Sequence, residues 1–193
     1  HNETIVKIND EFVAILEQGD FYETVLSEPA KIIATKPIAV AQFSNGESYD
    51  RDERGTFDNK ADPFMTVVPP VEQFLSNYNI TTPSDIYSDN FVNIIAPINS
   101  TGSIRLDGNS IDADLWITLP DPDYKGLQLP IGFGQHSLTG ALPFGVYVYG
   151  FSEYESYGSV GGSALPENTS VEACEMSGAK MRAQSGEDNC FSS

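Results

Sequence analysis

The chain has 193 residues, of which 28 are acidic and 10 are basic, so its formal net charge at neutral pH is -18. Such a charge repels phosphate, which excludes nucleic acids and anionic membranes as partners and favours cations or cationic proteins. No segment approaches the roughly 20 apolar residues that cross a bilayer, so we expect no membrane insertion.

Short strands are predicted in the first 43 residues. Residues 4–8 and 12–16 alternate apolar and polar side chains around an Asn9-Asp10 turn, and residues 21–26 and 31–34 follow. Residues 38–43 are apolar on both faces, which is typical of a central strand in a sandwich. The opening HNETIVKIND is polar and has no signal-peptide character, so we expect the chain to be a piece of a longer protein.

The remaining elements follow an acidic loop at residues 44–62. Val71, Phe74, Leu75 and Tyr78 fall at helical spacing after two prolines, which predicts at most a helix of one or two turns. Further strands are predicted by short apolar runs between Gly, Asn, Asp and Pro turns, at residues 91–96, 103–106, 114–119, 132–138 and 145–151. We expect the glycine- and tyrosine-rich tail after Phe151 to be a turn.

These elements predict an all-β fold, an antiparallel β-sandwich of about ten or more short strands with at most one short helix. The sandwich is assigned to residues 1–170, and residues 171–193 form a separate segment with both cysteines. A disulfide between Cys174 and Cys190 would contribute about 3 kcal/mol by loop entropy. The alternative is two unrelated thiols.

An ordered series of motifs resembles the N-terminal domain of the IgGFc-binding-protein family. The series runs KPIAVAQF from Lys36, ADPFMTVVPP from Ala61, IRLDG from Ile104 and PFGVYVYGF from Pro143, followed by SYG and GSAL. The resemblance covers most of residues 4–166 and implies an extracellular, non-catalytic adhesion or matrix module whose ligand is a protein or a glycan. The family domain usually extends further toward its N-terminus, so this chain is expected to be N-terminally incomplete. Four sequons fit the same extracellular location, at Asn2, Asn79, Asn99 and Asn168.

The acidic loop is a candidate calcium site. Calcium binds six to eight oxygen ligands, and the spacing Asp50-x-Asp52-x-x-Gly55 copies the start of an EF-hand loop. The copy is incomplete, because Arg54 stands where a third oxygen ligand belongs. The alternative is a solvated acidic loop. The candidate ligands are Asp50, Asp52, Glu53, Asp58 and Asp62.

Aromatic side chains are candidates for ligand binding. Trp116 could stack on a sugar or lie in the core, and Tyr154 and Tyr157 could form an exposed platform or cover a sheet edge. A platform of this kind would favour a carbohydrate-binding module.

The other polar candidates give no catalytic motif. His136 and Ser137 are neighbours on a predicted strand and point to opposite faces, so we expect a structural histidine. A second acidic stretch is predicted to supply turn residues or to share a cation, and it consists of Asp107, Asp112, Asp114, Asp121 and Asp123. Paired carboxylates across a cleft would instead indicate a glycosidase or another hydrolase.

Overall fold

The computed structural model describes residues 2–45 and 62–164, and within them it contains thirteen strands paired only in antiparallel ladders. Helical structure in these residues is limited to three short 3-10 segments, η1 (Val71–Gln73), η2 (Thr101–Ser103) and η3 (Ala113–Leu115). The strands are β1 (Thr4–Ile8), β2 (Glu11–Leu16), β3 (Ile32–Ala34), β4 (Val40–Phe43), β5 (Met65–Val68), β6 (Leu75–Thr81), β7 (Asp89–Pro97), β8 (Arg105–Leu106), β9 (Asn109–Ser110), β10 (Ile117–Thr118), β11 (Tyr124–Pro130), β12 (Gln135–Ser152) and β13 (Glu155–Val160). The predicted all-β class is confirmed. No helix in the described residues is long and apolar enough to span a bilayer.

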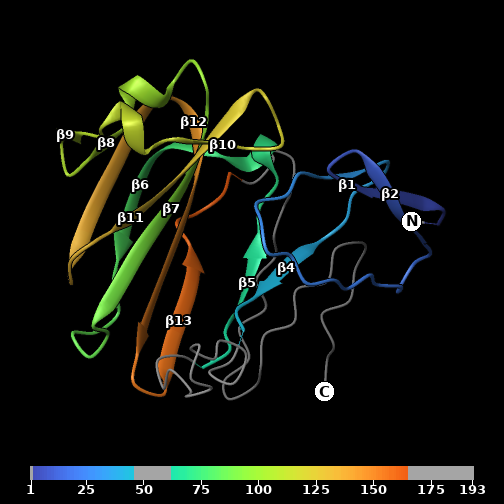
Figure 1. The fold of residues 1–193 in the computed structure, drawn as a ribbon, viewed down its shortest axis with the longest axis horizontal. Helices are drawn as coiled ribbons and strands as arrows, with labels where there is room; N and C mark the ends of the chain where they lie inside the picture. The colour runs from blue at the N-terminus through green and yellow to red at the C-terminus, as the bar shows by residue number, and fades with distance from the viewer. Residues whose placement is uncertain (1, 46–61, 165–193) are drawn as a thin grey trace, which may run out of the picture.

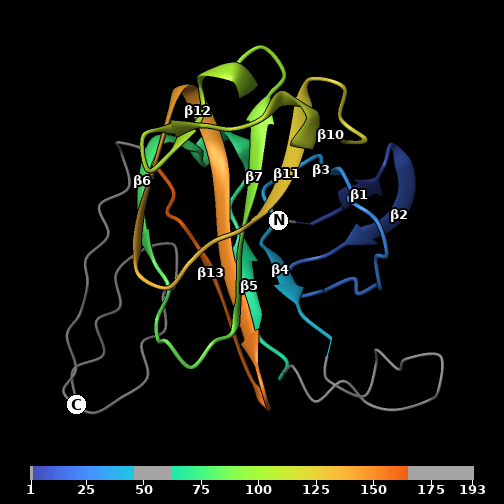
Figure 2. The ribbon, with the colours of Figure 1, turned by 60° about the vertical axis from the view of Figure 1, so that its left-hand side comes forward.

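The long strand β12 connects the two layers of the main sheet (Figures 1 and 2). Its first half pairs with β6 and β8, and its second half, from Gly145 onward, pairs with β7 and β13. The change of partner coincides with an irregular register between Thr139 and Phe144. Strands that switch sheets at such irregularities form the corners of sandwiches.

The hydrophobic core lies between these layers. Alternate residues of β7, which include Val92 and Ile94, are fully buried and face Tyr78 and Ile80 of β6. Leu138 and Phe144, on the first half of β12, complete the contact at 0% exposure. Because side chains alternate along a strand, the other residues of β7 and β12 form an outer face on the opposite side of this layer.

The N-terminal strands lie to one side of the main sheet. The order β2-β1-β3 makes a three-stranded sheet, and in Figure 1 the two-stranded ladder β4-β5 lies between it and the main sheet. Asn9 and Asp10 both have positive φ, which is the two-residue hairpin turn that the sequence predicts. Lys31, which precedes β3, forms an ion pair of 3.3 Å with Asp121 in the β10-β11 turn and so connects the three-stranded sheet to the main sheet.

Part of the outer face is covered by the segment that precedes β6. Phe64 packs where Gly158 leaves room, at centroid distances of 6.4 Å from the rings of Tyr149 and Phe151. Phe74 lies over Gly145 in the same way and is only 6% exposed. Glycines in neighbouring strands thus make the two positions at which this segment docks.

Several predicted elements are wrong. Of the helical spacing at residues 71–78, only the single turn η1 is helical, and the rest is β6, in which Tyr78 and Ile80 are buried with a period of two. Residues 38–43 are not a central strand, because β4 pairs only with β5 among the described residues and Phe43 is 66% exposed. Residues 21–26 form no strand. The tail after Phe151 turns at Glu153-Tyr154 and then forms β13, because its backbone completes a ladder with β12.

Candidate functional site

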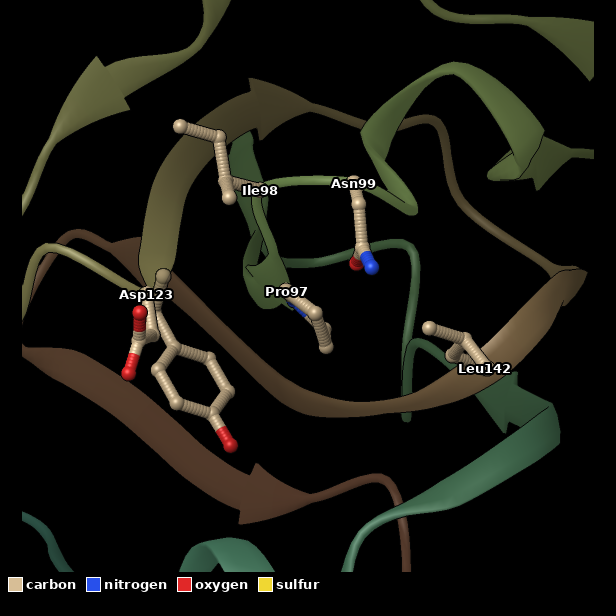
Figure 3. Close-up of a pocket in the computed structure, with 6 residues that line it drawn as sticks. Pro97, Ile98, Asn99, Asp123 and Leu142 are labelled. Atoms are coloured by element: carbon tan, nitrogen blue, oxygen red, sulfur yellow. The ribbon is translucent and has the colours of Figure 1, made fainter.

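A surface depression of about 380 Å³ lies at one end of the outer face. Pro97, at the end of β7, lies in the middle, with Asp123 on one side and Leu142 on the other (Figure 3). Ile98, Asn99 and Tyr124 complete the lining. The depression therefore combines apolar side chains with three polar ones, the Asn99 amide, the Asp123 carboxylate and the Tyr124 phenol.

Local turn chemistry fixes the shape of this depression. Tyr124, the first residue of β11, pairs with Pro97, and the amide of Ile98 donates to the Asp123 carbonyl at 2.9 Å. The Asp121 carboxylate accepts from the Asp123 amide at 3.1 Å, and its carbonyl accepts from the Tyr124 amide at 3.2 Å. Asp121 and Pro122 occupy the first and second positions of this turn, where aspartate and proline are favoured.

The electrostatic environment of the depression is acidic. Burial raises the pKa of Tyr124, and the negative charges of Asp121, Glu72 and Asp123 raise it further. Three carboxylates therefore act on one phenol at the surface of the depression, which makes the site receptive to a positive group.

The predicted aromatic residues are not brought together. Trp116 is 8% exposed and belongs to the hydrophobic core, so its ring is not a surface platform. Tyr157 on β13 is half-buried, donates to the Asn90 side chain at 2.8 Å and packs edge-on against Tyr87. Burial, followed by the influence of Tyr87, raises the pKa of Tyr157 to about 12. Tyr154 is 52% exposed in the turn between β12 and β13, where its φ is +59°.

A second aromatic group was missed by the sequence analysis. Tyr149 stacks on Phe91 at 5.5 Å across the β7-β12 ladder, and its hydroxyl accepts from Gln128 and donates to Asn93 at 3.2 Å. On its own strand, each of these residues occupies a position between two core positions. This alternation is the only sequence signal that could have predicted that they share a face of the sheet.

Both ring nitrogens of His136 lie within hydrogen-bonding distance of acceptors. One ring nitrogen, Nδ1, lies 2.7 Å from an oxygen of Asp107, and the other, Nε2, lies 2.9 Å from the Gly132 carbonyl. The second oxygen of Asp107 accepts from the Ser137 amide at 2.8 Å. With acceptors at both ring nitrogens, the charged imidazolium can donate twice.

The pKa values of this pair move in opposite directions. Burial opposes the charged form of His136, but the hydrogen bonds to Asp107 and to the Gly132 carbonyl outweigh it and raise the pKa of His136. The hydrogen bonds from His136 and from the Ser137 amide lower the pKa of Asp107.

The pair makes stability depend on pH. The contribution of His136 is complete below its unfolded pKa of 6.5 and is lost as the pH rises through its raised folded pKa. The contribution of Asp107 is present above its unfolded pKa of 3.8 and is lost as the pH falls through its lowered folded pKa.

At pH values between the pKa of Asp107 and that of His136, we expect His136→Gln to lower the free energy of unfolding by about 1 kcal/mol. The effect is small because Asp107 is solvent-exposed. Urea titrations from about pH 5 to about pH 9 measure this difference. A difference that stays constant over that range contradicts the assignment.

Asp62 is the one candidate calcium ligand within the described residues. Its side chain is exposed, and its backbone carbonyl accepts from the hydroxyls of Ser156 and Ser44. The other candidate ligands lie outside the described residues, as do Cys174 and Cys190. In the described part of the chain, no three His, Cys, Asp or Glu side chains gather in a way that could hold a metal ion.

The fold and the site define an all-β domain with a two-layer core and an acidic surface depression. The family model for IgGFc binding protein matches residues 1–150. The chain therefore belongs to the IgGFc-binding family. No curated protein and no solved structure matches it.

Proposed function

We propose that the chain is an extracellular, non-catalytic adhesion or matrix-binding module of a larger surface or secreted protein, and that its ligand is a protein. Membership of the IgGFc-binding family supports an extracellular binding role. Antibody constant regions, which the family name specifies, are accordingly the first protein ligand to test.

The observation that carries the proposal is the exposed apolar face of the β4-β5 ladder. Phe43 pairs with Met65 and Ala41 pairs with Val67, so the four side chains lie on one face. Phe43 is 66% exposed, Met65 56% and Val67 57%. Contiguous exposed apolar surface of this kind is typical of protein-interaction sites.

Calcium binding by the loop at residues 50–62 is a second part of the proposal. Asp62, the last residue of this loop, lies near this face, because its carbonyl accepts from the hydroxyls of Ser44 beside β4 and Ser156 on β13. Calcium bound by the carboxylates of the loop would raise the stability of the folded form by mass action.

An array of extracellular matrix proteins, antibody constant-region fragments and glycans tests the function, in calcium and in chelator. We expect saturable binding to a protein, and we expect the double variant Phe43→Ser/Met65→Ser to weaken it at least tenfold. Phe133→Ser is the matched control, because Phe133 is also 62% exposed but lies in the turn between β11 and β12.

Other outcomes favour the rival functions. Binding confined to glycans would support a carbohydrate-binding module, for which exposed Tyr154 is the remaining aromatic candidate. Turnover of a glycoside would show a hydrolase and contradict the proposal. Identical thermal melts in calcium and in chelator would reject the calcium site alone.

A further inference from the structure

We propose that the depression beside Tyr124 accepts an arginine side chain from a basic segment of the partner protein. This inference rests on the proposed function, because it specifies the chemistry by which the module would recognise a protein. The depression and the β4-β5 face have no residue in common, so each can be tested by its own variants.

The volume and the apolar lining residues of the depression can accommodate an arginine side chain. Its volume of about 380 Å³ lies near the lower end of the roughly 300–1,000 Å³ range of ligand sites. Pro97 and Leu142 offer apolar surface to an aliphatic stem, and Leu142 is 40% exposed. Long cationic side chains bury their stems on such surfaces while their charged ends reach polar groups.

The polar groups at the rim fit the guanidinium. Asp123 is exposed, and within residues 2–45 and 62–164 no lysine or arginine forms an ion pair with its carboxylate. Carboxylates accept two parallel hydrogen bonds from arginine, and an aromatic ring such as that of Tyr124 adds a stacking surface. Lysine lacks the planar fork, so arginine is the better fit.

One cation of the chain already pairs with a carboxylate of the same turn, next to the depression. Lys31, which comes from the N-terminal sheet region, reaches across to Asp121 at 3.3 Å, two residues before Asp123. The ion pair leaves Asp123 available for a second cation. The excess of acidic over basic residues in the whole chain steers basic partners toward such a position.

Amide NMR titration with a capped Gly-Arg-Gly peptide at low salt tests the proposal. We expect saturable shifts that concentrate on Ile98, Asn99, Asp123, Tyr124 and Leu142. The same peptide with citrulline in place of arginine keeps the shape and loses the charge, so it should cause no saturable shift.

Two variants of equal charge separate a specific site from a general acidic surface. Asp123→Asn should weaken the arginine peptide about fivefold. It keeps the turn, because the turn depends on the Asp121 side chain and the backbone amide of Asp123. Asp85→Asn should change the affinity less than twofold. Asp85 is exposed and lies beyond the opposite end of β7, roughly 30 Å away along nine strand residues.

Equal weakening by the two variants, or shifts spread over the acidic surface, overturns the proposal. The array separates this failure from failure of the proposed function. If a protein ligand binds the Asp123→Asn variant and the wild type equally, the arginine site is rejected and the binding function stands. If no protein binds but the peptide titration behaves as expected, the binding function fails while the depression remains an arginine site.

Discussion

Truncation of Phe144 to alanine is expected to lower the free energy of unfolding by about 3–5 kcal/mol. Phe144 is fully buried, and it lies where β12 leaves its pairing with β6 for its pairing with β7. Its ring packs edge-on against Tyr78 at 5.1 Å, and its carbonyl accepts from the Tyr78 hydroxyl. Removal of the ring leaves a cavity between the two layers, which rigid ladders on both sides cannot close. Urea unfolding followed by circular dichroism measures the loss.

Phe133→Ala is the matched control, because the same atoms are removed from a ring that is 62% exposed. It should change the stability by less than about 0.5 kcal/mol. If Phe144→Ala does not fold, Phe144→Leu leaves a smaller cavity and keeps the comparison measurable. A loss no larger for Phe144→Leu than for Phe133→Ala would contradict the position assigned to Phe144 in the core.

Substitution of Gly145 by valine is expected to cost about 1–3 kcal/mol through overpacking. A Cβ atom at this position would lie 2.5 Å from Cζ of Phe74, which is too close for two carbon atoms. Phe74 is buried, so its ring cannot swing into solvent without losing its own contacts. Thermal or urea unfolding of the variant measures the cost.

A second substitution identifies the cause of that cost. Phe74→Ala should be less destabilising in the Gly145→Val background than in the wild type, since valine then fills part of the space that the ring leaves. Gly102→Val is the control, because a Cβ atom there meets nothing within 4 Å. Additive effects of the two substitutions would show that Phe74 does not rest on Gly145.

The fold class and the tight turns could be predicted because their signals are local. Asn9-Asp10 supplies two residues that tolerate positive φ between alternating strands, and Asp107-Gly108 does the same between β8 and β9. The length of β12 could not be predicted. Gly140 and Pro143 within residues 132–151 read as a break, whereas the chain continues as one strand with an irregular register.

β6 and β11 show why the remaining elements were misread. The apolar spacing between Val71 and Tyr78 matches a helix, but the backbone of β6 finds its partners in β12, more than fifty residues away. β11 carries a glycine and ends in a proline, which weakens its strand signal, yet the register with β7 places Leu127 in the core. Both segments are strands because they pair with strands distant in the sequence, and a short stretch of sequence does not reveal such partners.

The candidate site was only partly visible in the sequence. Asp121 and Asp123 were recognised as members of an acidic stretch that supplies turn residues or shares a cation, and the Asp121 side chain does cap a turn. The depression also needs Pro97 and Leu142, which come from two other parts of the chain. Only the antiparallel pairing of β7 with β11 brings Pro97 beside Tyr124.

The sharing of β12 between both layers has a consequence for the way the domain opens. Backbone amides exchange with solvent either by local fraying or by cooperative opening of a whole unit. Since β12 is hydrogen-bonded to β6 and β8 along one half and to β7 and β13 along the other, neither layer can separate without breaking bonds of the same strand. Amides of Leu138 and Val148, in opposite halves, should therefore show the same free energy of opening in hydrogen exchange, as parts of one cooperative unit.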